Sequence, residues 1–316
     1  MTLRVVLFGG SGFIGSALGQ GLGPDVVAPR RRDLDLLDTG RVEAFLTPGD
    51  VVINAAGYAA ATDRTAAGLA RLRRDNVESV RSLAAASVSV GIRQLIHLSS
   101  VAAMGNREGV ALGEGDLAVP RSPYGRSKRD AEIVLEEAPA GLPVTILRPT
   151  SIFGEGRGLA RLLCRVAELP IVPLPAGGAA LVPFSYVGNL VEAVRVSLGR
   201  EACVGRTFIV GDERSYRLEE IIRELGVALD RRRTRILPFP SALARAMATA
   251  ESAARRVIGG APILDATRIE TLTCSVSYSI APFQAATGYV PPVSLREAAA
   301  RIAAWHRAES PSLEPE

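Results

Sequence analysis

A glycine-rich turn near the N-terminus constrains the fold more than any other feature of the chain. The mainly apolar run Leu3–Phe8 is followed by Gly9-Gly10-Ser11-Gly12-Phe13-Ile14-Gly15, and residues 11–22 read as a helix. Such a run is typical of a parallel strand buried on both faces. Glycines between strand and helix permit a tight turn and let the backbone approach a pyrophosphate at the helix N-terminus. The turn therefore predicts a dinucleotide site, and close packing of helix on strand is the structural alternative.

Strand-like and helix-like segments alternate through the first half of the chain. The predicted strands after the first are residues 25–28, 51–56, 94–99 and 144–147. The predicted helices between them are residues 39–46, 73–90 and 122–138. This succession predicts an α/β fold, a Rossmann doubly wound parallel sheet with right-handed crossovers.

The residue composition of the sequence changes after Pro149. Glycine, proline and short apolar pieces dominate residues 154–183, one more strand is predicted at 206–210, and a final amphipathic helix at 294–307. We expect a Rossmann domain, a smaller C-terminal α/β substrate-binding lobe and a flexible polar tail. Their predicted bounds are 1–154 with about 182–212 for the domain, about 155–181 with 213–308 for the lobe, and 309–316 for the tail.

Composition excludes several classes of function. The net charge of +4 is small and aromatic residues make up only 5%, which argues against a nucleic-acid binder and favours an anionic small molecule. Cys164, Cys203 and Cys274 are far apart in the sequence and match no metal-ligand spacing, so we expect neither a disulfide nor a metal site. No apolar run reaches the ~18–20 residues of a membrane helix. These features predict a cytoplasmic protein without membrane association.

The segment after the second predicted strand bears on the choice of cofactor. An NAD site expects an acidic residue about 20 positions beyond the turn, where it binds the ribose 2′-hydroxyl. Counting from Gly10 leads instead to Arg30, within Pro29-Arg30-Arg31-Arg32. An arginine can pair with a 2′-phosphate, so the sequence favours NADP(H) over NAD(H). A solvated charge cluster, offset by Asp33 and Asp35, is the alternative.

A tyrosine and a lysine four residues apart suggest the chemistry. Tyr124 and Lys128 share one face of a predicted helix, and an ammonium beside a phenol favours the phenolate. A phenol tuned in this way can exchange a proton with an alcohol or carbonyl oxygen. Ser99 and Ser100 close the strand predicted at 94–99, at the sheet edge where ligands bind in open α/β folds. His97, inside that strand, is interpreted as a core residue.

Together these motifs resemble the extended short-chain dehydrogenases/reductases of the NAD-dependent epimerase/dehydratase type, especially nucleotide-sugar 4-epimerases and 4-ketoreductases. The resemblance covers residues 3–307. Besides the glycine turn it rests on Asn54-Ala55-Ala56-Gly57, Asn76-Val77, Ser99-Ser100 with Gly105, Tyr124 to Lys128, and Leu147-Arg148-Pro149. It implies a homodimer joined through helices near residues 73–90 and 122–138.

The resemblance also implies roles for individual residues. Tyr124 would be the general acid/base, Lys128 would depress its pKa and bind the nicotinamide ribose, Ser100 would support the reacting oxygen, and Asn76 would support the lysine. With Arg30 included, the expected cofactor contacts are Gly9, Gly12, Phe13, Ile14, Gly15, Arg30, Asp35, Leu36, Ala55, Ala56, Ser99, Tyr124, Lys128 and Pro149.

The substrate side departs from the family pattern. Relatives carry an arginine near Val182 that contacts the substrate diphosphate, and Arg157, Arg161 or Arg268 are the candidates to replace it. The expected substrate contacts are Ser100, Met104, Ile152, Arg157 and Arg161.

Four functions stay open on the sequence. The favoured one is a 4-ketoreductase that transfers a hydride to a secondary carbon of a nucleotide-linked sugar. The alternatives are a nucleotide-sugar 4-epimerase with tightly bound NAD, a ketoreductase for a non-sugar substrate, and a non-catalytic dinucleotide-binding protein.

Overall fold

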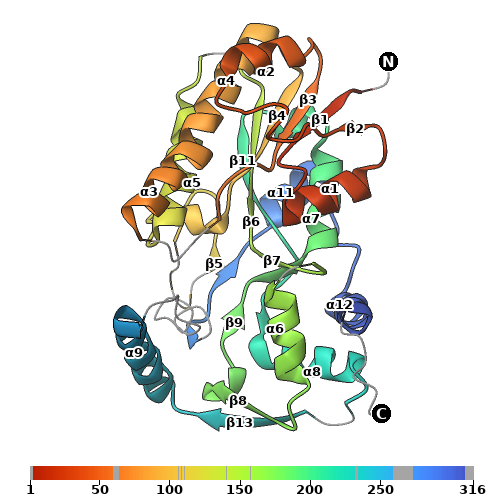
Figure 1. The fold of residues 1–316 in the computed structure, drawn as a ribbon. Coiled ribbons are helices and arrows are strands. Elements are labelled where there is room, and N and C mark those ends of the chain that lie inside the picture. The colour runs from red at the N-terminus through yellow and green to blue at the C-terminus, as the bar shows by residue number, and fades with distance from the viewer. Residues whose placement is uncertain are drawn as a thin grey trace, which may run out of the picture.

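The computed structural model describes residues 3–309 except 60–63, 106, 108, 110, 140, 157, 232–233 and 259–272. A six-stranded parallel sheet in the order β11-β6-β4-β3-β1-β2 forms its centre (Figure 1). The strands are β1 (Val5–Phe8), β2 (Val26–Val27), β3 (Val51–Asn54), β4 (Gln94–Leu98), β6 (Val144–Pro149) and β11 (Arg206–Val210). The predicted doubly wound fold is confirmed.

Helices cover both faces of this sheet because alternate strand residues are apolar in both directions. On one face, side chains such as Val6 and Val52 pack under α2 (Thr39–Phe45), α4 (Ser79–Val90) and α5 (Pro123–Glu136). On the other face, Leu7 and Ile53 pack under α1 (Phe13–Leu22), α7 (Val187–Ser197) and α11 (Ala281–Thr287). Figure 1 shows the two helical layers on either side of the strands.

The helix predicted at 73–90 is longer and has a break in its regular geometry. It begins as α3 (Ala66–Arg73), where the Thr65 side chain accepts a hydrogen bond from the Gly68 amide at 3.0 Å. A π-helical turn over Arg74–Glu78 then leads into α4. Such turns widen the helix and change the direction of successive side chains, often next to functional sites.

The second half of the chain builds a separate apolar core below the sheet (Figure 1). Its centre includes Val172, Ile221 and Ile302, each fully buried. The helices here are α6 (Gly158–Ala167), α8 (Leu218–Ala228), α9 (Ser241–Ile258) and α12 (Leu295–Glu309). The strands here are β7 (Ser151–Phe153), β8 (Ile171–Pro175), β9 (Leu181–Val182), β10 (Phe184–Tyr186), β12 (Tyr216–Arg217) and β13 (Arg235–Phe239). Two short strands, β5 (Ala111–Leu112) and β14 (Ser277–Tyr278), pair with each other and pack on the core of the main sheet.

Some sequence expectations are corrected or left open here. Residues 154–183 were expected to be short apolar pieces between turns, yet α6 forms a ten-residue helix within them. The expected flexible tail lies outside the described residues from position 310 onward. Cys164, Cys203 and Cys274 form no disulfide in the described part of the chain. In the described part of the chain, no helix is long and apolar enough to cross a membrane, and no cluster of acidic, histidine or cysteine side chains suits a metal ion.

Candidate active site

The glycine turn after β1 combines a packing role with an open helix end. A Cβ on Gly9, which has φ +85°, would lie 2.5 Å from the carbonyl carbon of Ala55, and one on Gly15 would lie 2.0 Å from the Gly9 oxygen. These two glycines let α1 approach β1 and β3. Gly12 differs, because a Cβ there would meet only the Gly9 oxygen at 3.4 Å. It precedes Phe13, where α1 begins without a side-chain cap, so an anion can approach this helix end.

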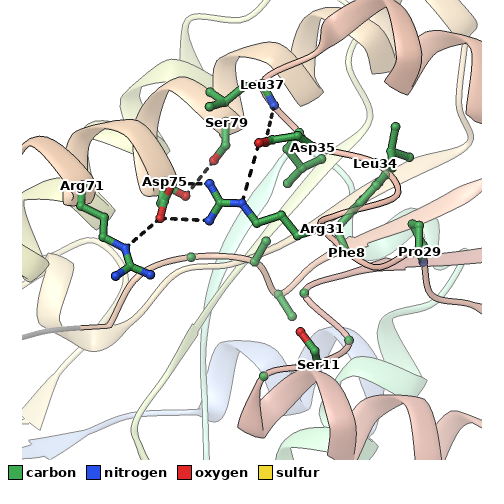
Figure 2. Close-up of a pocket in the computed structure, with 17 residues that line it drawn as sticks. Phe8, Ser11, Pro29, Arg31, Leu34, Asp35, Leu37, Arg71, Asp75 and Ser79 are labelled. Atoms are coloured by element: carbon green, nitrogen blue, oxygen red, sulfur yellow. Dashed lines mark hydrogen bonds and ion pairs between the residues drawn. The ribbon is translucent and has the colours of Figure 1, made fainter.

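A cavity of about 210 Å³ extends from this turn along the carboxyl ends of β1, β2 and β3 (Figure 2). It brings together many predicted cofactor contacts, namely Gly9, Gly12, Asp35, Leu36, Ala55 and Ala56. Arg30, the predicted cation of this site, is exposed and does not line the cavity, whereas Arg31 does. Arg31, one position further along the chain, therefore occupies the place in the cavity that the residue count assigned to Arg30.

Two carboxylates hold the Arg31 guanidinium. Its Nη2 and Nη1 atoms donate to Oδ1 and Oδ2 of Asp75 at 2.8 and 3.2 Å, and its Nε lies 3.8 Å from Oδ2 of Asp35. Figure 2 shows Arg31 between these two acids, with Ser11 of the glycine turn across the cavity. Sequence reasoning did not identify Asp75, which lies 44 residues from Arg31 in the chain.

The predicted proton-transfer pair lies on α5. Ser122 caps this helix by accepting a hydrogen bond from the Gly125 amide at 3.0 Å, which places half-buried Tyr124 and buried Lys128 one turn apart. A Cβ on Gly125 would lie 2.3 Å from the Ala102 carbonyl oxygen, so this glycine lets the start of α5 pack on the loop after Ser100. That packing brings the loop that carries Ser100 to the helix that carries Tyr124.

Ser100 lies two residues beyond the carboxyl end of β4, at the sheet edge where the sequence predicted it. Its Oγ accepts a hydrogen bond from the Ala102 amide at 3.1 Å and thereby caps the 3-10 turn Val101–Ala103. The hydroxyl hydrogen of Ser100 is left available for another acceptor.

Lys128 lies against the carboxyl end of β4. Its Nζ donates to the Leu98 carbonyl oxygen at 2.8 Å. Burial lowers the pKa of Lys128 to about 8, and the charge of nearby Glu132 acts in the opposite direction. An amine with this pKa is still mainly protonated, and therefore cationic, at neutral pH.

Asn76 supports this helix. Its Oδ1 accepts from the Tyr58 amide at 2.7 Å, and its Nδ2 donates to the Tyr58 carbonyl at 3.0 Å and to Ser127 Oγ at 2.9 Å. A Cβ on Gly57 would lie 2.9 Å from Asn76 Oδ1 and 3.6 Å from Lys128 Nζ, so the glycine leaves room for both groups.

A buried ionic cluster behind Lys128 was not anticipated. Glu132 is fully buried and accepts hydrogen bonds from Nε and Nη2 of Arg148 at 2.9 and 2.8 Å. Ser99 donates to the same carboxylate at 2.5 Å, although the sequence placed Ser99 with the cofactor. Glu132 follows Lys128 by four residues, and this spacing was the available signal.

The predicted substrate residues are scattered. Met104 is buried and Ile152 is half-buried in β7. Arg161, on α6, forms an ion pair with Glu309 and lies over the Trp305 ring at 5.5 Å from its centroid. Arg157 and Arg268 lie outside the described residues.

The parallel sheet, the glycine turn after its first strand and the polar residues at its carboxyl edge define a Rossmann-type dinucleotide-binding architecture. The model of the NAD dependent epimerase/dehydratase family matches residues 5–211. The chain therefore belongs to that family.

Known proteins resemble the chain over nearly its whole length. UDP-glucose 4-epimerase of Vibrio cholerae is 26% identical over 94% of this chain and 93% of its own. The 2-alkyl-3-oxoalkanoate reductase of Stenotrophomonas maltophilia is 26% identical over 96% of this chain and 99% of its own. The structure of UDP-glucuronic acid 4-epimerase from Bacillus cereus with UDP-glucuronic acid and NAD superposes with a TM-score of 0.73 at 16% identity, covering 98% of this chain and 100% of that one. This last likeness concerns the fold alone.

Proposed function

We propose that this protein is an NAD-dependent 4-epimerase of a nucleotide-linked sugar. The observation that carries the proposal is the buried Lys128 amine, held at the Leu98 carbonyl one helical turn after Tyr124, at the ligand-binding edge of the sheet. The 4-epimerases among the relatives, including that of Vibrio cholerae, support this choice over the 4-ketoreductase that the sequence favoured.

The described residues fit a nicotinamide dinucleotide. The uncapped start of α1 beyond Gly12 suits the pyrophosphate, and the cavity from Gly9 to Asp75 suits the adenosine. A bound nicotinamide would supply the reversible hydride acceptor that inversion at C4 requires. Lys128 would bind the nicotinamide ribose through its ammonium group.

The residues of this chain handle the proton. Tyr124 takes the proton from the C4 hydroxyl as the hydride leaves, which makes a ketone, and returns it to the oxygen when the hydride comes back. Lys128 stabilises the phenolate form of Tyr124 before it takes the proton and after it has returned it, because a positive charge within reach favours the ionised phenol. The Ser100 hydroxyl donates to the reacting oxygen, where negative charge develops.

One observation favours a second candidate, a reductase of a non-sugar ketone. Val182 is fully buried in the separate apolar core below the sheet, so this position offers no cation to a substrate diphosphate. The reductase of Stenotrophomonas maltophilia matches the chain over a similar length.

The experiment incubates purified protein with UDP-glucose and UDP-N-acetylglucosamine and follows the 4-epimers by chromatography. The epimerase proposal expects inversion without net NADH consumption, and NAD released from the protein on denaturation. A reaction that consumes stoichiometric NADPH with a non-sugar ketone, and none with either sugar nucleotide, would replace it with the second candidate.

Tyr124→Phe tests the site itself. We expect turnover to fall about 10²–10⁴-fold, the usual contribution of general acid–base catalysis, while the dissociation constant of NAD changes little. Tyr216→Phe is the matched control, since the Tyr216 hydroxyl donates to Oδ2 of Asp212 at 3.0 Å and Tyr216 belongs to the separate core below the sheet. Near-normal turnover by Tyr124→Phe would refute the assigned role.

A further inference from the structure

We propose that Asp75 sets the cofactor preference of the adenosine cavity: by holding the Arg31 guanidinium it occupies the cation that a 2′-phosphate would need, so the cavity favours NAD over NADP. The inference deepens the proposed function and rests on its assignment of this cavity to adenosine. It reverses the preference that the arginine run in the sequence suggested.

The contact with Asp75 leaves a 2′-phosphate only the Nε side of the Arg31 guanidinium, and Asp35 already lies there. Both terminal nitrogens donate to Asp75, and Nε faces Asp35. This is the two-bond, parallel arrangement by which arginine also binds phosphate, so the carboxylate and a 2′-phosphate would compete for one edge of the guanidinium.

Burial makes Asp75 a strong competitor. Its side chain is 7% exposed, whereas that of Arg31 is 53% exposed. Burial alone would raise the pKa of Asp75, but the hydrogen bonds and charges of Arg31 and Arg71 lower it below its ordinary value. The carboxylate is therefore ionised at neutral pH, and removing Arg31 from it would leave a buried negative charge with one cation fewer.

The other cations around the cavity are engaged as well. Arg71 donates from Nε to Oδ2 of Asp75 at 3.3 Å, and its guanidinium lies 4.1 Å from the Tyr58 ring centroid. Nη2 of Arg74 lies 3.8 Å from Oδ2 of Asp35. A 2′-phosphate carries a charge of about −1.5 to −2 and would lie beside two carboxylates that already pair with these three arginines.

The π-helical turn explains why Asp75 lies at the cavity. Asp75 and Asn76 are consecutive in this turn, yet Asp75 bonds Arg31 at the adenosine end and Asn76 bonds Ser127 beside the catalytic lysine. The Asp75 main-chain carbonyl accepts from Ser79 Oγ at 2.8 Å, a bond that does not involve the carboxylate. Substitution of the Asp75 side chain can therefore change the charge at the cavity while this backbone contact is kept.

The experiment measures dissociation constants of NAD and NADP by calorimetry for protein freed of bound nucleotide. Asp75→Asn keeps the shape and removes the charge, and we expect it to shift the affinity ratio at least tenfold towards NADP. Adding Arg31→Gln in the same protein should cancel that gain. Arg30→Gln is the matched control, because this neighbouring arginine does not line the cavity and should leave the ratio within about twofold.

A measurement on the unaltered protein keeps the proposal testable if the Asp75 variant fails to fold. We expect adenosine 2′,5′-bisphosphate to bind no more tightly than 5′-AMP, since the only difference between them is the 2′-phosphate. Tighter binding of the bisphosphate, or an unchanged ratio in folded Asp75→Asn, would overturn the inference. These binding data require no sugar substrate, so they fail or succeed independently of the epimerase assay.

Discussion

Two arginine–carboxylate pairs with similar bond lengths lie in different environments in this molecule. Arg148 bonds Glu132 through Nε and Nη2 at 2.9 and 2.8 Å, and Arg31 bonds Asp75 through Nη2 and Nη1 at 2.8 and 3.2 Å. The side chains of the first pair are 6% and 0% exposed, whereas Arg31 is 53% exposed. Bond lengths therefore do not distinguish the two pairs, and the solvent exposure of the arginine does.

The same kind of contact can serve the architecture of a fold or a binding site. The buried pair ties α5 to β6 one helical turn beyond Lys128, and Ser99, which follows β4, bonds the same carboxylate. Separating the pair would leave a charge without water or partner, so the contact fixes the helix that carries Lys128. In the cavity pair the arginine is exposed while Asp75 is buried, so the carboxylate holds its partner at a surface that a ligand can reach.

The largest effect should come from breaking the buried pair. Glu132→Gln removes the charge opposite Arg148, and we expect the free energy of unfolding to fall by about 3–5 kcal/mol, the usual cost of an uncompensated buried charge. Urea denaturation followed by circular dichroism measures this change.

Glu136 provides the matched control on the same helix. It bonds Arg129 at 2.6 and 3.1 Å but is 44% exposed. Glu136→Gln should therefore cost no more than about 1 kcal/mol. Similar losses for both variants would show that burial does not separate the two kinds of pair.

Most of the fold and the central pair of the site follow from the sequence. The glycine turn, the strand periodicity and the four-residue spacing of Tyr124 and Lys128 are local signals, and the structure keeps them local. Ser99 and Ser100 show what a stricter use of the same rules would add. Consecutive strand residues point to opposite faces, so this rule conflicts with the prediction that Ser99 and Ser100 both reach the cleft. Ser99 instead bonds Glu132 under α5.

The missed features depend on contacts between distant segments. Arg31 lines the cavity and Arg30 does not. Arg31 bonds Asp75, 44 residues further along the chain, and Asp75 lies in a π-helical turn that the spacing of apolar residues does not reveal. The helix α6 lies in a segment bounded by glycine and proline, and it packs against the separate apolar core below the sheet. Sequence patterns report the local preference of a segment, and tertiary contacts decide where side chains of a loop point.

Acid titration provides a second, smaller test of the buried region. His97 lies two residues before Ser99 on β4, where its Nδ1 contacts Asn54 Nδ2 at 3.2 Å and burial lowers its pKa well below the usual 6.5, with the charge of Lys128 adding to the shift. The folded state therefore keeps His97 neutral while the unfolded state binds a proton below pH 6.5. The contribution of His97 to the free energy of unfolding should therefore fall by up to about 1.4 kcal/mol per pH unit as the pH decreases from there.

Two variants separate this loss from other acid effects. His97→Gln should flatten the slope between about pH 6.5 and 4.5, and His306→Gln, which changes the second of the two histidines, should leave that contribution in place. Asp75 does not interfere in this window, because its pKa lies below 3.8 and its stabilising contribution is lost only as the pH falls through that lower value. An unchanged slope in His97→Gln would locate the acid sensitivity elsewhere.

The smallest effect on stability is expected from breaking the cavity pair of Arg31 and Asp75. Arg31→Gln removes one cation from Asp75, but Arg71 still donates to that carboxylate at 3.3 Å and solvent reaches the Arg31 side of the contact. We expect a loss of about 0.5–1 kcal/mol in urea denaturation, typical of a partly exposed ion pair. A loss above about 2 kcal/mol would mean that Arg31 holds the fold together as Arg148 does.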